Sequence, residues 1–152
     1  MIKFVSYDIV FQEVPDEVSL ALNISGCPNR CPGCHSIHLI EDVGHELSEE
    51  SLTSLVEQYR SSITCVCFMG GDADPSQIEY LGEFVQQRFG LKSAWYSGRN
   101  QMPRNMKALN YIKLGDYRES CGGLNSPSTN QRMYKIVDGE PCDITSRFWN
   151  NR

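Results

Sequence analysis

The order of extended and helical segments restricts the possible fold of this sequence more than any other feature. Apolar segments that end in or at glycine alternate with amphipathic segments along the chain. Two extended stretches near the start are expected to pair as an N-terminal β-hairpin, and two helices are expected, one after the N-cap Ser48 and one over Pro75–Phe89. The expected strands cover residues 3–7, 9–13, 18–24, 63–69, 91–97, 109–114 and 132–137.

This alternation predicts an α/β fold with parallel strands joined by crossover helices. Four of the expected strands are followed by glycine, at Gly26, Gly70-Gly71, Gly98 and Gly115. Ligands of such folds bind beyond the carboxyl ends of the strands, where glycine lets the backbone approach a bound group. The strands are too few to close an eight-stranded barrel. We therefore expect an open, partial parallel β/α barrel, formed by residues 1–152 as a single domain.

Charge and hydropathy exclude several classes of protein. The 152-residue chain has a formal net charge of −5, which argues against nonspecific binding to nucleic acid. No segment approaches the roughly 20 apolar residues of a membrane-spanning helix, and acidic residues interrupt the N-terminus before any signal-like apolar run. We expect a cytoplasmic protein without a membrane partner. Seven cysteines in a reducing compartment favour metal binding or redox chemistry over disulfides.

Three of the cysteines lie close together after the strand expected at 18–24. Cys27, Cys31 and Cys34 have the spacing C-x3-C-x2-C. A structural zinc site needs four ligands, for which His35 or His38 could supply the fourth. Three thiolates could instead hold a [4Fe–4S] cluster and leave one iron open to a substrate or cofactor. The spacing favours the cluster, while zinc and plain thiols remain open alternatives.

The motifs as a set resemble a known family. C-x3-C-x2-C after a strand resembles the signature of radical S-adenosylmethionine (SAM) enzymes. Within that superfamily, "GCPNRCPGCH", "FMGGD" and "GGLNSPSTNQRMY" resemble the small activases of glycyl radical enzymes, above all those of anaerobic ribonucleotide reductase. The resemblance extends over nearly the whole chain, including its short length and its glycine-ended strands.

The resemblance implies two cofactors and the residues that hold them. Cys27, Cys31 and Cys34 would bind three irons of a [4Fe–4S] cluster, and SAM would chelate the fourth iron through its amino and carboxylate groups. Gly70-Gly71-Asp72 stands where the family has Gly-Gly-Glu, which contacts the SAM amino group. Asp72 keeps the carboxylate of that motif but holds it one methylene closer to the backbone.

Three further positions carry a cofactor role by resemblance. Gly33 precedes the third cysteine, where the superfamily often has a bulky residue near adenine, so the adenine contacts here would be largely with backbone. Ser97 is the candidate contact for ribose or methionine. Lys113 stands where related activases place a lysine that can meet the SAM carboxylate. Asn130-Gln131-Arg132 matches a recurrent motif of these proteins, with a role near the cofactor or the partner.

The implied activity is that of an activating oxidoreductase. One electron, from a donor such as flavodoxin or ferredoxin, would cleave SAM, and the resulting 5′-deoxyadenosyl radical would take hydrogen from a glycine of the partner enzyme. The expected partner is the large subunit of anaerobic ribonucleotide reductase. Two alternatives remain: activation of another glycyl radical enzyme, such as one like pyruvate formate-lyase, and a zinc-stabilised interaction module without catalysis.

The other cysteines and Trp95 have simpler interpretations. Cys65 and Cys67 lie two residues apart in an expected strand, so both point to one face and are expected to be small buried side chains, with a second metal or redox pair as the alternative. Cys121 and Cys142 fall in expected loops. Trp95 is expected to pack in the core rather than stack on a cofactor.

Overall fold

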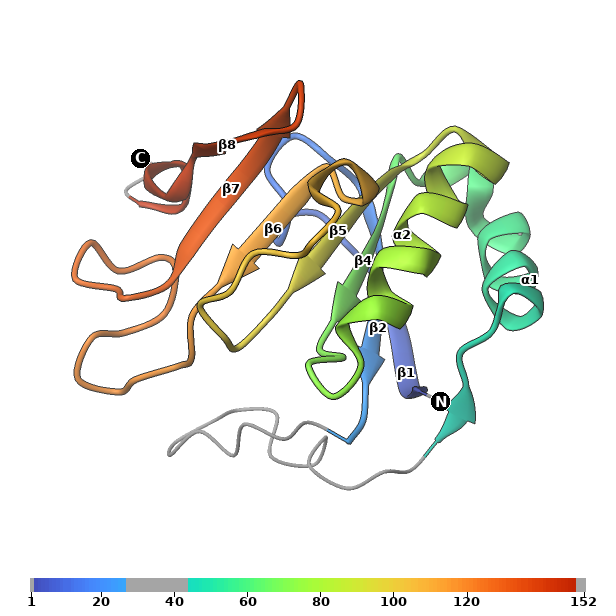
Figure 1. Cartoon of the computed structure of the whole chain (residues 1–152), viewed down its shortest axis with the longest axis horizontal. Coiled ribbons are helices and arrows are strands. Elements are labelled where there is room, and N and C mark those ends of the chain that lie inside the picture. The colour runs from blue at the N-terminus through green and yellow to red at the C-terminus, as the bar shows by residue number, and fades with distance from the viewer. Residues whose placement is uncertain (1, 27–43, 150–152) are drawn as a thin grey trace.

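The computed structural model describes residues 2–26 and 44–149, and its main feature is a mixed eight-stranded sheet. The strand order across the sheet is β3-β1-β2-β4-β5-β6-β7-β8 (Figure 1). The strands are β1 (Lys3–Val10), β2 (Ser19–Ile24), β3 (His45–Glu46), β4 (Cys65–Met69), β5 (Lys92–Tyr96), β6 (Tyr111–Leu114), β7 (Arg132–Val137) and β8 (Glu140–Asp143).

Four neighbouring strands in the middle of the sheet run parallel. β2 pairs with β4, β4 with β5, and β5 with β6 in parallel register, so their arrowheads point to one edge (Figure 1). Parallel neighbours need crossover connections, and α2 (Pro75–Phe89) supplies the one between β4 and β5. The expected strands at 18–24, 63–69, 91–97, 109–114 and 132–137 and the expected helix Pro75–Phe89 are thereby confirmed. The partial barrel of the radical SAM type stays a prediction.

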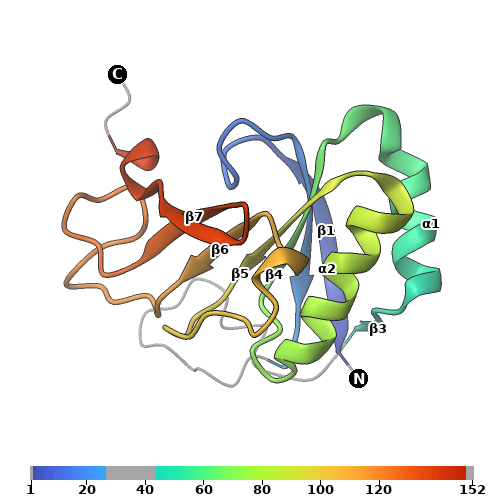
Figure 2. The same ribbon diagram turned by 45° about the horizontal axis from the view of Figure 1, so that its top comes forward.

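The helices α1 (Glu49–Tyr59) and α2 cover one face of the parallel strands (Figure 2). Their buried faces, with Leu52 and Val56 from α1 and Ile78 from α2, belong to one apolar core with Leu22 and Phe68 of the sheet. None of the helices in the described residues is long and apolar enough to cross a membrane.

Local signals in the sequence set the ends of both helices. Ser48 caps α1 as expected: its side chain accepts a hydrogen bond from the backbone N–H of Ser51, and the Ser51 hydroxyl oxygen accepts one from the backbone N–H of Ser48. Asp74 caps α2, which begins at Pro75 and ends at Phe89, and the C-cap Gly90 has a φ of +68°. Proline suits the first helical turn, and glycine tolerates the left-handed residue that ends a helix.

The N-terminal hairpin differs from the expectation. Residues 3–7 and 9–13 do not pair with each other, because residues 3–10 form the single strand β1. β1 pairs antiparallel with β2 and, over two residue pairs, with the short β3. The hairpin that exists is therefore β1–β2, joined by residues 11–18.

That connection packs on the face of the sheet opposite the helices. Val14 is fully buried there, in a second apolar cluster with Cys65, Cys67 and Met133. Backbone and side chains of the loop are tied to the sheet: the Tyr96 hydroxyl donates to the Glu13 carbonyl at 2.5 Å, and the Tyr111 hydroxyl donates to the Glu17 carboxylate at 2.9 Å. The Asp16 carboxylate meets the Arg147 guanidinium near the C-terminus at 2.6 Å.

The last two strands make the sheet mixed rather than wholly parallel. β7 runs antiparallel to β6, and β8 returns antiparallel to β7 through a turn at Asp138-Gly139, where both residues have positive φ. β8 was not among the expected strands, and all four of its residues are exposed. Cys142 thus lies in a strand and not in a loop, whereas Cys121 lies in the loop between β6 and β7 as expected.

Candidate site at the carboxyl edge of the parallel strands

The residues that follow the four parallel strands lie along one edge of the sheet, here called the carboxyl edge. It consists of residues 25–26, 70–72, 97–98 and 115. Five of the site residues predicted from the sequence belong to it or to the strand ends beside it: Gly70, Gly71, Asp72, Ser97 and Lys113. The other four, Cys27, Cys31, Cys34 and Gly33, lie outside the described residues.

The glycine pair is required by backbone conformation and by close packing. Gly70 and Gly71 have φ of +115° and +96°, values that side chains disfavour. A Cβ on Gly70 would lie 3.1 Å from the Ile24 carbonyl oxygen, and one on Gly71 would lie 2.5 Å from Cδ1 of Ile78. The Gly70 carbonyl also accepts a hydrogen bond from Nε1 of Trp95 at 2.7 Å. The pair therefore lets the chain turn tightly between the ends of β2 and β5.

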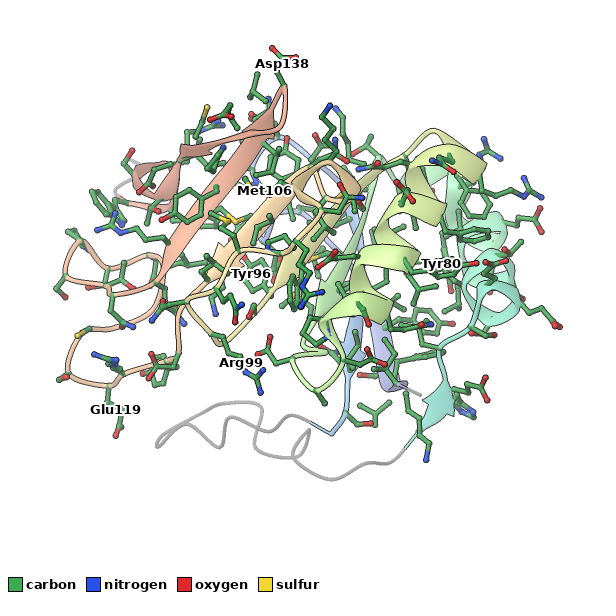
Figure 3. The ribbon with its side chains drawn as sticks, viewed as in Figure 1. Tyr80, Tyr96, Arg99, Met106, Glu119 and Asp138 are labelled. Carbon is green, nitrogen blue, oxygen red and sulfur yellow. The ribbon has the colours of Figure 1, made fainter. Side chains whose placement is uncertain are left out.

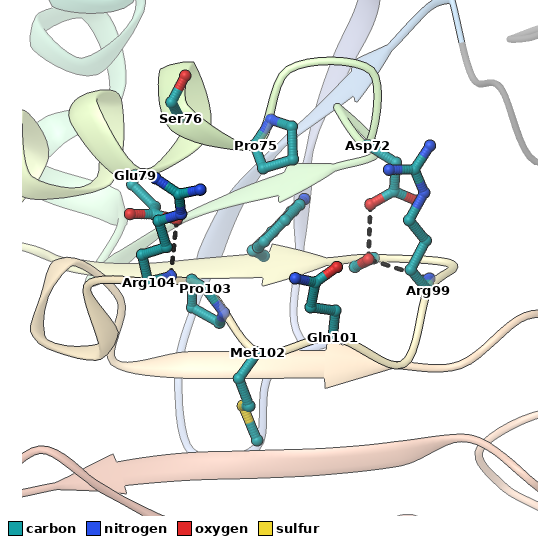
Figure 4. A pocket seen from close by; sticks show the side chains of 11 residues that line it. Asp72, Pro75, Ser76, Glu79, Arg99, Gln101, Met102, Pro103 and Arg104 are labelled. Carbon is teal, nitrogen blue, oxygen red and sulfur yellow. Dashed lines mark hydrogen bonds between the residues drawn. The ribbon is translucent and has the colours of Figure 1, made fainter.

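Asp72 uses both carboxylate oxygens to join the end of β4 to the end of β5. Oδ1 accepts from the Ser97 hydroxyl at 2.5 Å, and Oδ2 accepts from the Gly98 backbone N–H at 2.8 Å. The Ser97 oxygen in turn accepts from the backbone N–H of Arg99 at 3.1 Å (Figure 4). Asp72 and Ser97 are 2% and 1% exposed. This arrangement keeps the Asp72 carboxyl group out of bulk water and hydrogen-bonded through both of its oxygens.

Lys113 places a cationic side chain on the other side of Ser97. Its Nζ donates to the carbonyl oxygens of Ser97 at 3.1 Å and Gly115 at 2.9 Å, and lies 5.6 Å from the centre of the Tyr96 ring. Lys113 is 8% exposed. Its ammonium therefore binds the ends of β5 and β6 together, a contact that its predicted role toward a cofactor did not include.

The Asn130-Gln131-Arg132 motif reaches the same edge. Nε2 of Gln131 donates to the Gly115 carbonyl at 3.3 Å, and Nδ2 of Asn130 donates to the Asp116 carbonyl at 3.0 Å. Both contacts hold the turn after β6, so the motif supports the edge on which Lys113 lies.

The described cysteines do not add a metal site. Cys65 and Cys67 are fully buried, as predicted, and within residues 2–26 and 44–149 no group of three or more His, Cys, Asp and Glu side chains could hold a metal ion. Burial raises the pKa of the Cys65 thiol to about 12 and raises that of Cys67 well above its usual range. Both are therefore neutral thiols at physiological pH. Cys121 is half-buried and Cys142 exposed, and neither forms a disulfide.

The carboxyl edge holds buried groups of both charges: the Asp72 carboxylate and the Lys113 ammonium lie on either side of Ser97. Gly70 and Gly71 pack directly against Ile24 and Ile78 beside them. A zwitterionic ligand at this edge would find a group of opposite sign for each of its charges.

Residues beyond those predicted from the sequence also meet at this edge. Asp72 and Ser97 form part of the wall of a cavity of about 360 Å³, together with Trp95, Arg99 and Arg104. Trp95 is buried, as predicted, and its ring packs in the core under this cavity. Arg99 points outward from the edge (Figure 3). Nothing in the spacing of "SGRNQMPR" singled out the two arginines, because only the fold brings them to α2.

Comparison with known proteins identifies one family. The model of a family described as a 4Fe-4S single cluster domain matches residues 17–103. That range contains the three clustered cysteines, the glycine pair and Ser97. No curated protein and no solved structure matches the chain.

Proposed function

The chain belongs to the family of 4Fe-4S single cluster domains, and on this premise we propose that it is a radical SAM enzyme that installs a glycyl radical on anaerobic ribonucleotide reductase. The observation that carries the proposal is the buried contact between Asp72 and Ser97 beside the glycine pair. That contact lies at the edge toward which β2 leads, and the C-x3-C-x2-C motif begins three residues after β2 ends. The proposal includes a partial, open parallel β/α barrel, for which the four consecutive parallel strands are the support.

The residues that would hold the two cofactors divide by chemistry. Cys27, Cys31 and Cys34 would supply three thiolates to a [4Fe–4S] cluster, the group that the family membership assigns to this protein. Gly33 would offer backbone atoms to the adenine of SAM. When bound, the cluster would pass one electron from an external donor, such as flavodoxin or ferredoxin, to SAM, and this reductive cleavage would supply the radical chemistry directed at the partner's glycine.

The described residues would orient SAM rather than transfer protons. Asp72 carries the negative charge that the SAM amino group requires, and Lys113 the positive charge that its carboxylate requires. Ser97 lies between them, with its hydroxyl held by Asp72 and its carbonyl by Lys113. Because these three side chains are nearly inaccessible to water, their charges act in a region of lower effective dielectric, where such contacts are stronger.

The proposal is tested by SAM cleavage. The full chain is reconstituted anaerobically with iron and sulfide, reduced with dithionite and given SAM, and 5′-deoxyadenosine is quantified. We expect a brown protein that forms 5′-deoxyadenosine, loss of both colour and product in Cys31→Ala, and neither loss in Cys142→Ala, which removes an exposed thiol. A colourless protein that retains one zinc ion and forms no product would instead support the zinc-stabilised module.

A further inference from the structure

A cavity on the helix side of the carboxyl edge has a lining of which the proposed SAM chemistry uses only Asp72 and Ser97. It lies between the first turns of α2 and residues 99–104, and has a volume of about 360 Å³ (Figure 4). Pro75 of α2 and Met102 and Pro103 of the facing segment give it apolar walls. We call it the arginine pocket, because Arg99 and Arg104 also line it.

The acidic side chains of the arginine pocket are already occupied. The two carboxylate oxygens of Glu79 accept hydrogen bonds from the backbone N–H groups of Arg104 at 3.0 Å and Asn105 at 3.1 Å. Asp72 accepts from Ser97 and Gly98, as described above. Backbone N–H groups thus satisfy both carboxylate oxygens of Glu79.

The side chains of the two arginines differ from these hydrogen-bonded carboxylates. Among the described residues, neither the Arg99 nor the Arg104 guanidinium has a hydrogen bond or ion pair, although the backbone of both residues is fixed. The Arg99 N–H donates to Ser97 Oγ and its carbonyl accepts from Gly115 N–H at 2.8 Å, which sets where its side chain starts. Two exposed guanidiniums beside apolar walls, on a hydrogen-bonded backbone, form a surface suited to carboxylates that are carried on an apolar segment.

We propose that the arginine pocket docks an acidic, apolar segment of a partner protein. Its two arginines match the charge of carboxylates on such a segment. A highly charged ligand such as a nucleic acid is disfavoured by the net charge of −5 on the chain. The pocket shares Asp72 and Ser97 with the carboxyl edge. A partner segment docked in the pocket therefore places the adjoining residues of the partner protein at that edge. Only the identity of the docked protein, the glycyl radical enzyme, rests on the proposed function.

Binding of a defined peptide tests the proposal. The probe is fluorescein-labelled Glu-Leu-Glu-Leu-Glu, added to the reconstituted full chain, and its fluorescence anisotropy is measured. Because hydrogen bonds to charged groups contribute about 1.5–3 kcal/mol, Arg99→Glu and Arg104→Glu should each weaken binding by about tenfold or more. Arg88→Glu is the matched control: it makes the same charge change at the exposed far end of α2, and its binding should stay within about twofold of wild type.

Three results would overturn the proposal. They are equal binding by the wild type and both pocket variants, equal weakening in Arg88→Glu, and arginine-dependent binding of ATP or citrate in place of the peptide. The last would make the pocket a site for small anions. Circular dichroism identifies a variant that fails to fold. If one pocket variant fails to fold, peptide binding by the other pocket variant decides whether the proposal holds.

A separate readout distinguishes this proposal from that of SAM cleavage. Arg104→Glu, the pocket variant farther along the segment from Ser97, should form 5′-deoxyadenosine from SAM at the wild-type rate with dithionite, and form less glycyl radical on the partner. If the wild type cleaves no SAM, the proposed function fails while the peptide measurements still decide the role of the pocket. If SAM is cleaved and the peptide does not bind, the pocket proposal alone fails.

Discussion

Replacing Asp72 tests whether the carboxyl edge is built as described. Asp72→Ala removes the acceptor of two hydrogen bonds and leaves the buried Ser97 hydroxyl and the half-buried Gly98 N–H without that partner. Each buried polar group left without a partner costs about 1–3 kcal/mol. Removing the carboxylate offsets part of this cost, because its own desolvation penalty disappears. We expect the free energy of unfolding to fall by about 3 kcal/mol. For a chain of this length, that corresponds to a melting temperature lower by about 6–12 °C.

Asp72→Asn separates hydrogen bonding from charge. The amide oxygen can still accept from Gly98, while the amide nitrogen can donate to Ser97 Oγ, whose hydroxyl proton then lacks its acceptor. The expected loss is about 1 kcal/mol, because only one hydrogen bond is replaced by a poorer one. Asp8→Ala is the matched control for charge: Asp8 is exposed in β1, and its loss should change the stability by less than about 0.5 kcal/mol.

The assay is thermal unfolding followed by circular dichroism, on anaerobically reconstituted proteins at one scan rate. The predicted order of melting temperatures is wild type and Asp8→Ala highest, then Asp72→Asn, then Asp72→Ala. Equal melting temperatures for Asp72→Ala and Asp8→Ala would refute the assignment of Asp72 as the tie between β4 and β5. In the same samples, Asp72→Ala should keep the cluster's visible absorbance and bind SAM more weakly in equilibrium dialysis. Unchanged affinity for SAM would remove Asp72 from the cofactor site.

Further predictions concern packing and buried thiols. Gly82→Ala, which in an ordinary helix gains about 1 kcal/mol, should lower the melting temperature, because its Cβ would lie 2.6 Å from the Ala108 carbonyl oxygen; a higher melting temperature would contradict this packing. Burial holds the pKa of Cys65 at about 12, above the unfolded value of about 8.5, so only the unfolded state loses this proton in between. The stability that the protonated Cys65 thiol contributes is complete below about pH 8.5 and is lost as the pH rises toward 12. The melting temperature of Cys65→Ala should therefore change less between about pH 8 and 10.5 than that of the wild type. At pH 8, iodoacetamide should alkylate the exposed Cys142 and spare Cys65 and Cys67, as peptide mass spectrometry would detect; labelling of the buried pair at the rate of Cys142 would contradict their burial.

Local signals explain why part of the fold could be predicted from the sequence. The helix Pro75–Phe89 was predicted with both ends, because proline at its start and glycine after it act on the neighbouring backbone alone. The N-terminal hairpin was predicted wrongly because most residues of β1 are partly or fully exposed, which leaves no alternation to mark one continuous strand. Its pairing with β2 depends on contacts between residues up to 20 positions apart.

The sequence predicted which edge of the sheet carries the site, but it did not predict the hydrogen bonds within that site. Glycines after parallel strands indicated where a ligand could approach, and Asp72, Ser97 and Lys113 do meet there. Their hydrogen bonds follow from the register of β4 against β5, which sets Met69 beside Tyr96 and so brings residues 72 and 97 together. No pattern within either segment encodes that register. Arg99 and Arg104 were missed for the same reason, since a loop acquires its place from the strands that it joins.

The central claim is the transfer of a radical to a protein glycine, and electron paramagnetic resonance measures it most directly. The reconstituted full chain is incubated anaerobically with SAM, a reductant and the large subunit of anaerobic ribonucleotide reductase, and in parallel with pyruvate formate-lyase. We predict a glycyl radical signal on the reductase that requires SAM and is absent with Cys31→Ala. A signal on pyruvate formate-lyase alone would reassign the partner. Absence of any glycyl radical, in samples where the cluster is intact and reduced, would contradict the proposed function.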